Sequence, residues 1–233
     1  MKIYLVRHAE SVGNLKGSLV STTDFGLTEK GKKQSQRLGE FLNEELKAKK
    51  LTTYCSPLLR AKQTLQEMLS CIDACDVTVT EIPELKEMDL GILEGMPFDE
   101  QVIRYPDINL GNGLSHFSAP GGECYRDIKR RTEQFYNTHI DGSEDENIVI
   151  VSHGITLRVL VNTILQRPDE DVNCLNWFEN TAQTVLAYDE EKGGFYLDKL
   201  NDYSHLKELV TANYKDWGFF AAKDAYLKRI AGE

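Results

Sequence analysis

The stretch "NIVIVSHGITLRVLVNTIL", residues 147–165, decides the fold class of this chain. It opens with four consecutive β-branched residues, from Ile148 to Val151, a pattern typical of a short strand that is buried on both faces. From Ile155 onward it is an apolar run of helical length. A buried strand followed at once by an apolar helix indicates a sheet that is covered by helices.

The segments on either side repeat this alternation. Strands are predicted at 2–7 ("KIYLVR"), 51–55 ("LTTYC") and 77–80 ("VTVT"), and helices at 28–50, 57–69 and 122–140. Ser56 is a candidate N-cap for the second helix, with Pro57 at its first position. The segments 181–189 and 193–200 are expected to form a terminal hairpin or a pair of edge strands. The prediction is therefore an α/β protein, a three-layer α/β/α sandwich with a mostly parallel central sheet.

The chain shows no internal repeat, low-complexity tract or linker that would divide it, so residues 1–233 are predicted to form a single domain. The segment from about 96 to 122 is rich in Gly, Asn, Ser and Pro, and we interpret it as an irregular, lid-like insertion. The tail, from about 205 to 233, is interpreted as a dimer contact, a cover for the pocket or a helix packed on its own domain.

Composition limits the partners. The 37 acidic and 27 basic residues give a formal charge of -10, which disfavours nucleic acid and anionic membranes but not a small anionic ligand in a local pocket. The five cysteines are odd in number and include no C-x-x-C pair, which favours reduced thiols in the cytoplasm. No signal-peptide pattern and no membrane-spanning apolar stretch stand in the sequence, so the cytoplasm is the expected location.

Polar groups of one chemical kind follow three of the predicted strands. They are Arg7, His8 and Asn14; Ser56 to Arg60; and Ser152, His153 and Gly154. In a doubly wound sheet such strand ends meet at one edge, where arginines and helix N-termini together suit a phosphate group. Each of these residues alone is more often structural than functional, but their joint appearance at three strand ends is harder to obtain by chance.

The stretch "LVRHAES" resembles the defining motif of the histidine phosphatase superfamily, which includes the cofactor-dependent phosphoglycerate mutases. Further blocks are similar to family segments and follow in the family's order as far as about residue 165: "DFGLTEKGKKQSQRLGEFL", "YCSPLLRAKQT", "LKEMDLGILEG", "PGGE" and "VIVSHG". The resemblance implies a phosphoglycerate mutase-like fold and phosphoryl transfer to a histidine.

Roles are carried over from this resemblance one residue at a time. It implies that His8 is the nucleophile, which a neutral imidazole can be near physiological pH. It implies that Arg7, Arg60, Asn14 and His153 hold the phosphoryl oxygens. The backbone N–H of Gly154 is expected to contribute, and Ser21 and Thr22 are expected to border the pocket.

A leaving alkoxide also needs a proton from a general acid. The stretch "PELKEMDLGILEG" offers four acids, and chemistry alone does not choose among Glu84, Glu87, Asp89 and Glu94. The resemblance places the role on Glu87. For Glu94, which precedes Gly95, we expect a structural role in closing the turn.

The choice of reaction rests on the insertion. Its stretch 96–123 contains only Arg104 and His116 as basic groups, and the acidic turn is similar to that of the family's phosphatases. We therefore expect a metal-independent phosphomonoesterase acting on a small phosphorylated metabolite, with no cofactor and no metal. Mutase-type phosphotransfer dependent on 2,3-bisphosphoglycerate is the alternative. A non-catalytic phospho-ligand module and a metal-dependent hydrolase built on His8 and His153 rank lower, and a homodimer is left open.

Overall fold

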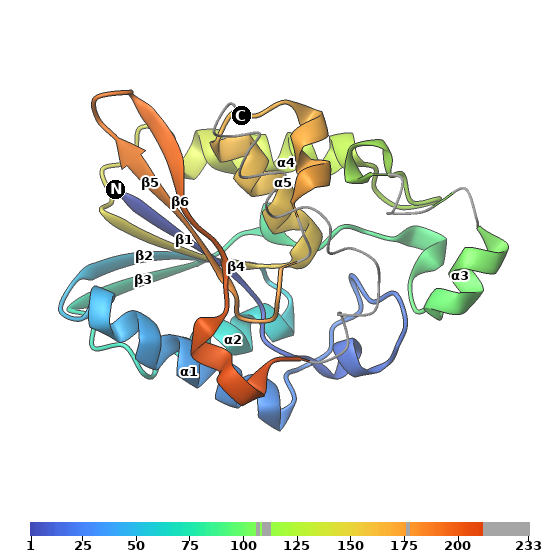
Figure 1. Ribbon diagram of the computed structural model, residues 1–233, viewed down its shortest axis with the longest axis horizontal. Coiled ribbons are helices and arrows are strands. Elements are labelled where there is room, and N and C mark those ends of the chain that lie inside the picture. The colour runs from blue at the N-terminus through green and yellow to red at the C-terminus, as the bar shows by residue number, and fades with distance from the viewer. Residues whose placement is uncertain (106–107, 109–112, 176–177, 212–233) are drawn as a thin grey trace.

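The computed structural model describes residues 1–105, 108, 113–175 and 178–211. Within them one six-stranded sheet has the order β3-β2-β4-β1-β5-β6 (Figure 1). Its strands are β1 (Lys2–Arg7), β2 (Lys50–Cys55), β3 (Asp76–Glu81), β4 (Asn147–Ser152), β5 (Gln183–Asp189) and β6 (Gly194–Asp202). Strands β1 to β4 pair in parallel, and β5 runs antiparallel to both β1 and β6. The predictions of a mostly parallel sheet and of a hairpin near residues 181–200 are confirmed.

Helices cover both faces of this sheet (Figure 1). They are α1 (Glu29–Leu46), α2 (Leu59–Leu69), α4 (Tyr125–His139) and α5 (Gly154–Ile164). A further short helix, α3 (Phe98–Arg104), lies away from the sheet. The pair α1 and α2 lies on one side of the sheet, and α4 and α5 lie on the other. The three-layer sandwich is therefore confirmed.

Strands β1 and β4 each supply side chains to two separate cores. Tyr4 and Val6 of β1 join the core under α1 and α2, whereas Ile3 and Leu5 join the core under α4 and α5. Because successive side chains of a strand point to opposite faces, a strand buried on both sides must be apolar throughout. This is the reason for the continuous apolar run at 148–151.

Three predicted helix limits are wrong, one of them the start of α4, which begins at Tyr125 rather than at residue 122. Helix α1 begins after Thr28, whose hydroxyl accepts the N–H of Gly31 (2.9 Å), but it ends at Leu46 rather than near residue 50. Ala48 takes a left-handed backbone conformation (φ 57°), which ends helices. Helix α2 begins at Leu59 rather than at Pro57, and Asp24 from a distant loop accepts the N–H of Leu59 (2.6 Å).

The insertion is more ordered than the sequence predicts. It contains α3 and a 3-10 helix at Leu114–His116. Leu114 and Phe117 are buried with Leu90 and Val159, so this half of the insertion belongs to a third apolar core. Residues 106–107 and 109–112 of the insertion lie outside the described residues, and its role as a lid stays a prediction.

The described part of the tail packs against α1. A 3-10 helix at Ser204–Leu209 is held by Gln34, whose side-chain amide donates to the carbonyl of Leu209 (2.7 Å). Lys30 donates to the carbonyl of Val210 (3.0 Å). Residues 212–233, which make up most of the predicted tail, lie outside the described residues.

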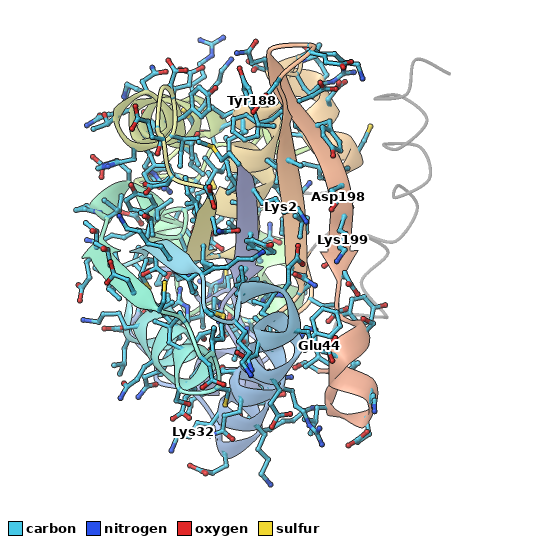
Figure 2. All side chains as sticks on the ribbon, turned by 90° about the vertical axis from the view of Figure 1, so that its left-hand side faces the viewer. Lys2, Lys32, Glu44, Tyr188, Asp198 and Lys199 are labelled. Carbon is cyan, nitrogen blue, oxygen red and sulfur yellow. The ribbon has the colours of Figure 1, made fainter. Side chains whose placement is uncertain are left out.

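The outer edge of the sheet at β6 carries charged side chains. Figure 2 shows Asp198 and Lys199 along β6, with Lys2 of β1 nearby. Charge on an edge strand opposes pairing with another chain.

None of the helices that the structure describes is long and apolar enough to cross a membrane. All five cysteines are free thiols.

Candidate active site

The ends of β1, β2 and β4 meet at one edge of the sheet. In the register, Arg7 of β1 lies opposite Ser152 of β4, and Cys55 of β2 lies opposite Val151. The backbone N–H of His8 donates to the carbonyl of Ser152 (2.9 Å). The three polar segments that follow these strands are therefore brought together, as predicted, with the ring centroids of His8 and His153 5.1 Å apart.

His8 is held in one tautomer. Its Nδ1 lies 2.8 Å from the carbonyl oxygen of Ala9, and because a carbonyl can only accept, Nδ1 carries the hydrogen. The Nε2 atom is then the unprotonated nitrogen, and it accepts from Nε of Arg60 (3.3 Å). Burial, followed by the charges of Arg60 and Arg7, holds the pKa of His8 well below its usual value of 6.5. His8 is thus a neutral imidazole with a lone pair on Nε2.

Two buried arginines flank this imidazole. Arg60, the second residue of α2, also donates to the carbonyls of Ser21 (2.5 Å) and Thr23 (3.1 Å). Its pKa is lowered by burial, whereas the charge of Glu87 acts in the opposite direction. Arg7 ends β1 and donates to the carbonyl of Phe178. Two guanidinium groups beside two histidines give this edge a positive charge in a protein that is negative overall.

His153 is held by Ser56 rather than being free to turn. Its Nε2 lies 2.7 Å from the hydroxyl of Ser56, which also accepts the N–H of Leu58 (3.3 Å). Its Nδ1 is buried and has no hydrogen-bond partner in the described part of the chain. Burial and the charge of Arg60 hold the pKa of His153 well below 6.5. Ser56, predicted as a helix cap, is instead the residue that orients His153.

The loop at residues 21–23 connects Arg60 with Glu94. The carboxylate of Glu94 accepts the backbone N–H groups of Ser21 (3.1 Å) and Thr23 (3.0 Å), and that of Thr22 at 3.4 Å. The hydroxyl of Ser21 donates to the carbonyl of Met88. Glu94 therefore has a structural role, as predicted, but the loop that it holds is at residues 21–23 rather than its own turn at Gly95. Direct binding of substrate by Ser21 and Thr22 stays a prediction.

Asn14 is connected to His8 through a second asparagine, Asn180. The Oδ1 atom of Asn14 accepts the N–H of Ser11 (2.9 Å) and lies 3.4 Å from the side-chain amide of Asn180. Asn180 is fully buried and donates to the carbonyl of His8 (2.8 Å). Asn180 was not predicted as a site residue, because it stands far from every motif, just before β5, and only the fold brings it to His8.

Glu87 lies at the N-terminus of α5, the helix that Gly154 begins. Its carboxylate accepts the N–H groups of Ile155 and Thr156, each at 3.2 Å, and that of Met88 at 3.0 Å. The first N–H groups of a helix have no carbonyl partner within the helix, so they suit a carboxylate or a phosphate. The side chain of Glu87 is buried.

The other three acids of the segment are used elsewhere. Asp89 accepts the N–H of Gly91 (2.8 Å) in a local turn, and Glu84 accepts from the side chain of Gln134 (3.1 Å). Glu94 holds the loop at 21–23. Glu87 differs from these three acids in lying at the N-terminus of α5. Its role as the general acid stays a prediction. Within the described residues, no group of three or more His, Cys, Asp or Glu side chains could hold a metal ion.

Comparison with known proteins shows the family to which this chain belongs. The family model described as "Histidine phosphatase superfamily (branch 1)" matches residues 3–203. A relative from Erwinia tasmaniensis, named "Probable phosphoglycerate mutase GpmB", is 28% identical over 215 residues, covering 90% of this chain and 97% of that protein.

Two solved structures share the fold. The Bacillus stearothermophilus protein YhfR superposes with a TM-score of 0.74 at 26% identity, covering 88% of this chain and 98% of that one. The alpha-ribazole phosphatase from Shigella flexneri gives 0.72 at 24% identity, covering 87% and 97%. Since the family model matches most of the chain, including all six strands described above, this protein belongs to branch 1 of the histidine phosphatase superfamily.

Proposed function

We propose that this protein is a phosphomonoesterase that hydrolyses a small phosphorylated metabolite through a phosphohistidine on His8. The observation that carries the proposal is the state of His8: a buried, neutral imidazole whose Nδ1 donates to the Ala9 carbonyl and whose Nε2 keeps its lone pair beside Arg60. A nitrogen in this state is ready to attack phosphorus without first losing a proton.

In the first step, Nε2 of His8 forms a bond to phosphorus, and the bond from phosphorus to the ester oxygen breaks. The charges of Arg7 and Arg60 offset the charge on the phosphoryl oxygens, and neutral His153 donates a hydrogen bond to them. The preorganised positions of these groups supply most of the rate enhancement. Glu87 in its acid form gives a proton to the departing oxygen, which leaves as an alcohol.

In the second step, water attacks the phosphorus of phosphohistidine. Glu87, now a carboxylate, takes the proton from that water, and the nitrogen–phosphorus bond breaks. Inorganic phosphate is released, and His8 returns to the neutral form. One carboxyl group can serve both steps because the leaving alcohol and the entering water occupy the same side of the phosphoryl group.

Hydrolysis is preferred to phosphoglycerate mutase chemistry because the insertion offers few cations. Of its two basic residues, Arg104 is exposed and pairs with Glu100 (2.9 Å), and His116 is exposed. The Shigella structure of this fold is named a phosphatase. The Erwinia relative is named a phosphoglycerate mutase, which supports mutase-type transfer as the second candidate. A cytoplasmic location and a homodimer are further parts of this proposal, carried by the sequence alone.

A panel of phosphate esters that includes 3-phosphoglycerate, assayed with the wild type and with His8→Ala, tests the proposal. We expect phosphate release by the wild type only, unchanged by EDTA, and an acid-labile phosphoenzyme that is absent from the variant. Isomerisation of phosphoglycerate, primed by 2,3-bisphosphoglycerate and without net phosphate release, would establish the mutase instead. Tight binding of phosphate esters with no turnover of any would identify a non-catalytic module.

A further inference from the structure

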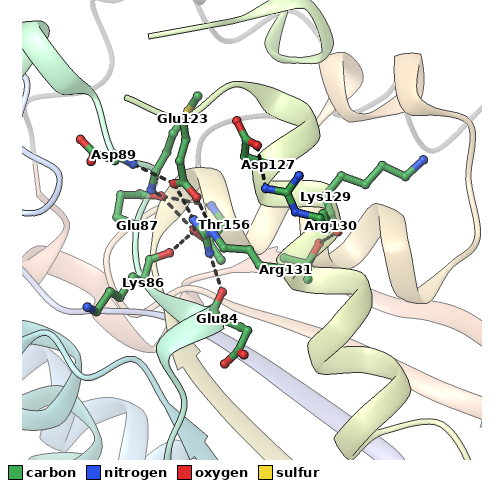
Figure 3. Close-up of polar contacts among 12 residues, drawn as sticks. Glu84, Lys86, Glu87, Asp89, Glu123, Asp127, Lys129, Arg130, Arg131 and Thr156 are labelled. Atoms are coloured by element: carbon green, nitrogen blue, oxygen red, sulfur yellow. Dashed lines mark hydrogen bonds and ion pairs between the residues drawn. The ribbon is translucent and has the colours of Figure 1, made fainter. Parts of the chain in front are cut away.

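Arg131 of α4 is directed into the protein, unlike the cations beside it. Its side chain is 15% exposed, compared with 75% for Arg130, which pairs with Asp127 on the helix surface. Arg131 forms a two-pronged ion pair with Glu123, from Nε to Oε1 (3.0 Å) and from Nη2 to Oε2 (3.2 Å). Figure 3 shows Arg131 reaching toward Glu123 and Thr156, while Arg130 and Lys129 point away. We call the Arg131–Glu123 pair the brace.

The brace holds the backbone on both sides of Glu87. Arg131 donates to the carbonyl of Glu84, three residues before Glu87. Glu123 accepts the N–H of Asp89 (2.9 Å), two residues after Glu87, and its own N–H donates to the carbonyl of Asp89 (2.8 Å). The segment that carries the proposed acid is thus fixed at both ends by one ion pair.

Two glycines bring the brace close to this segment. Gly91 has a left-handed backbone (φ +52°), and a Cβ placed on it would lie 2.3 Å from the carbonyl of Pro120. A Cβ on Gly122 would lie 2.3 Å from the carbonyl of Asp89. Only glycine permits the two turns to pack backbone against backbone. The close packing gives Glu123 a fixed position relative to Asp89.

Thr156 links the brace to the carboxyl group itself. Its hydroxyl donates to the carbonyl of Lys86 (2.6 Å) and lies 3.2 Å from Oε1 of Glu87 and 3.4 Å from Nη2 of Arg131. A charged side chain from α4, a hydroxyl from α5 and the acid therefore meet in one network (Figure 3).

We propose that Arg131, together with Glu123, is a positioning device for Glu87, so that the brace acts on proton donation to the leaving group and not on capture of the phosphoryl group. The inference rests on the proposed role of Glu87 as the general acid. The hydrogen bonds of Arg131 support this division, because they join it to Glu84, Glu123 and Thr156. Its charge also helps to lower the pKa of His153, but less than burial and the charge of Arg60 do.

The experiment compares esters whose leaving groups differ in their need for a proton. Ethyl phosphate must receive one, whereas p-nitrophenol leaves as an anion. The measured quantity is kcat/KM, which reports the steps up to departure of the leaving group. For Arg131→Met we expect a loss of about 10- to 100-fold with ethyl phosphate, and at most about 3-fold with p-nitrophenyl phosphate, because general acid catalysis contributes about 100-fold or more.

Arg130→Met is the matched control, since it removes a cation one residue away that has no contact with the acid segment. It should change kcat/KM for either ester by no more than about 2-fold, as surface substitutions usually do. If Arg131→Met does not fold, Glu123→Gln replaces it, because this change removes the charge of the pair but keeps an acceptor oxygen.

A double-variant cycle separates positioning from general damage. If Arg131 acts through Glu87, Arg131→Met should cost little further activity in a Glu87→Gln background. The proposal for the brace would be wrong if Arg131→Met lowered kcat/KM equally for both esters. It would also be wrong if Arg131→Met caused its full loss of activity again in the Glu87→Gln background. If Glu87→Gln lost activity selectively with ethyl phosphate but Arg131→Met did not, the proposal for the brace would be wrong, and the role of Glu87 as the acid would stand. Equal slowing of both esters by Glu87→Gln would refute the acid assignment itself, and the brace with it.

Discussion

The proposed phosphate pocket (Arg7, His8, Arg60 and His153) and the acid segment (residues 84–89) are held in place in different ways. Around the phosphate pocket, Arg7 and His8 follow a strand directly, and Arg60 lies in the first turn of a helix that follows another strand. In the acid segment, Glu87 lies between two short 3-10 helices, Pro83–Leu85 and Gly91–Leu93, and is held from α4 and α5. The first region is therefore built on the ends of paired strands, whereas the second is held by contacts with α4, α5 and the turn that carries Glu123.

This difference separates the effects expected from substitution. Groups around the phosphate act on every ester alike, since all esters carry the same phosphoryl group. Groups around the acid act in proportion to the leaving group's need for a proton. The ratio of activity on ethyl phosphate to activity on p-nitrophenyl phosphate therefore assigns a residue to one region or the other.

Arg60→Lys should give the largest effect of the substitutions considered next. A lysine cannot reproduce the three contacts of the guanidinium to His8, Ser21 and Thr23. We expect kcat/KM to fall by about 100- to 1000-fold, the usual loss for a preorganised donor, and equally for both esters. Arg37→Lys, at an exposed position on α1, is the control. A loss of activity confined to ethyl phosphate would instead show that Arg60 acts on proton donation to the leaving group.

Acidification should destabilise the fold through its buried histidines. His8, His153 and His205 have pKa values lowered chiefly by burial, that of His205 to about 4. Their neutral forms therefore stabilise the fold above pH 6.5, the usual histidine pKa, and this stability is lost as the pH falls through the folded-state values.

Urea unfolding between pH 7 and pH 4 measures this loss. The free energy of unfolding should decrease with acidification, and His205→Gln should remove a part of that decrease on the order of 2 kcal/mol. Histidine ring NMR should show His8 neutral at pH 6, with the hydrogen on Nδ1. A charged His8 at that pH would contradict the assignment of the nucleophile.

Ser56→Ala tests the orientation of His153. Loss of the hydroxyl leaves His153 Nε2 without its partner, and we expect kcat/KM to fall by about 10-fold for both esters, the value of one hydrogen bond. Ser70→Ala, at the other end of α2, should leave activity unchanged. If Ser56→Ala retained full activity, Ser56 would not be needed to set the ring.

Cys124→Ser should have the smallest effect and should raise stability. Cys124 is the N-cap of α4, and its thiol donates to Asp127 (3.0 Å). Serine is a preferred N-cap, so we expect the free energy of unfolding to increase by about 0.5–1 kcal/mol with kcat/KM unchanged for both esters. A decrease in thermal stability would show that the sulfur contributes more by packing than by capping.

The positions of the residues in the phosphate pocket could be predicted from the sequence better than the contacts that hold the acid segment. Motifs that follow apolar strands predict where His8, Arg60 and His153 lie, because parallel strands end at one edge of the sheet. The support of Glu87 was not predictable, since Arg131 stands 44 positions further along the chain (131 − 87) and belongs to a helix with several other cations. Only the fold shows which of these cations points inward.

The start of α2 was predicted wrongly for a similar reason, because contacts from distant parts of the chain decide it. Ser56 and Pro57 form a good local signal for a helix start, but tertiary contacts with His153 and Asp24 override it. The order within the insertion was also missed, because its Gly- and Pro-rich composition conceals the few apolar residues, such as Leu114 and Phe117, that join a core.

The carboxylate of Glu94 has a consequence for redesign of substrate range. It accepts hydrogen bonds from the N–H groups of Ser21 and Thr23, and the carbonyls of the same two residues accept hydrogen bonds from Arg60. These three residues therefore form a spacer of fixed length between the acid segment and the phosphate pocket. A library that inserts or deletes residues at 21–23 would displace Arg60 in every member, whereas length changes in the exposed part of α3 leave this spacer intact.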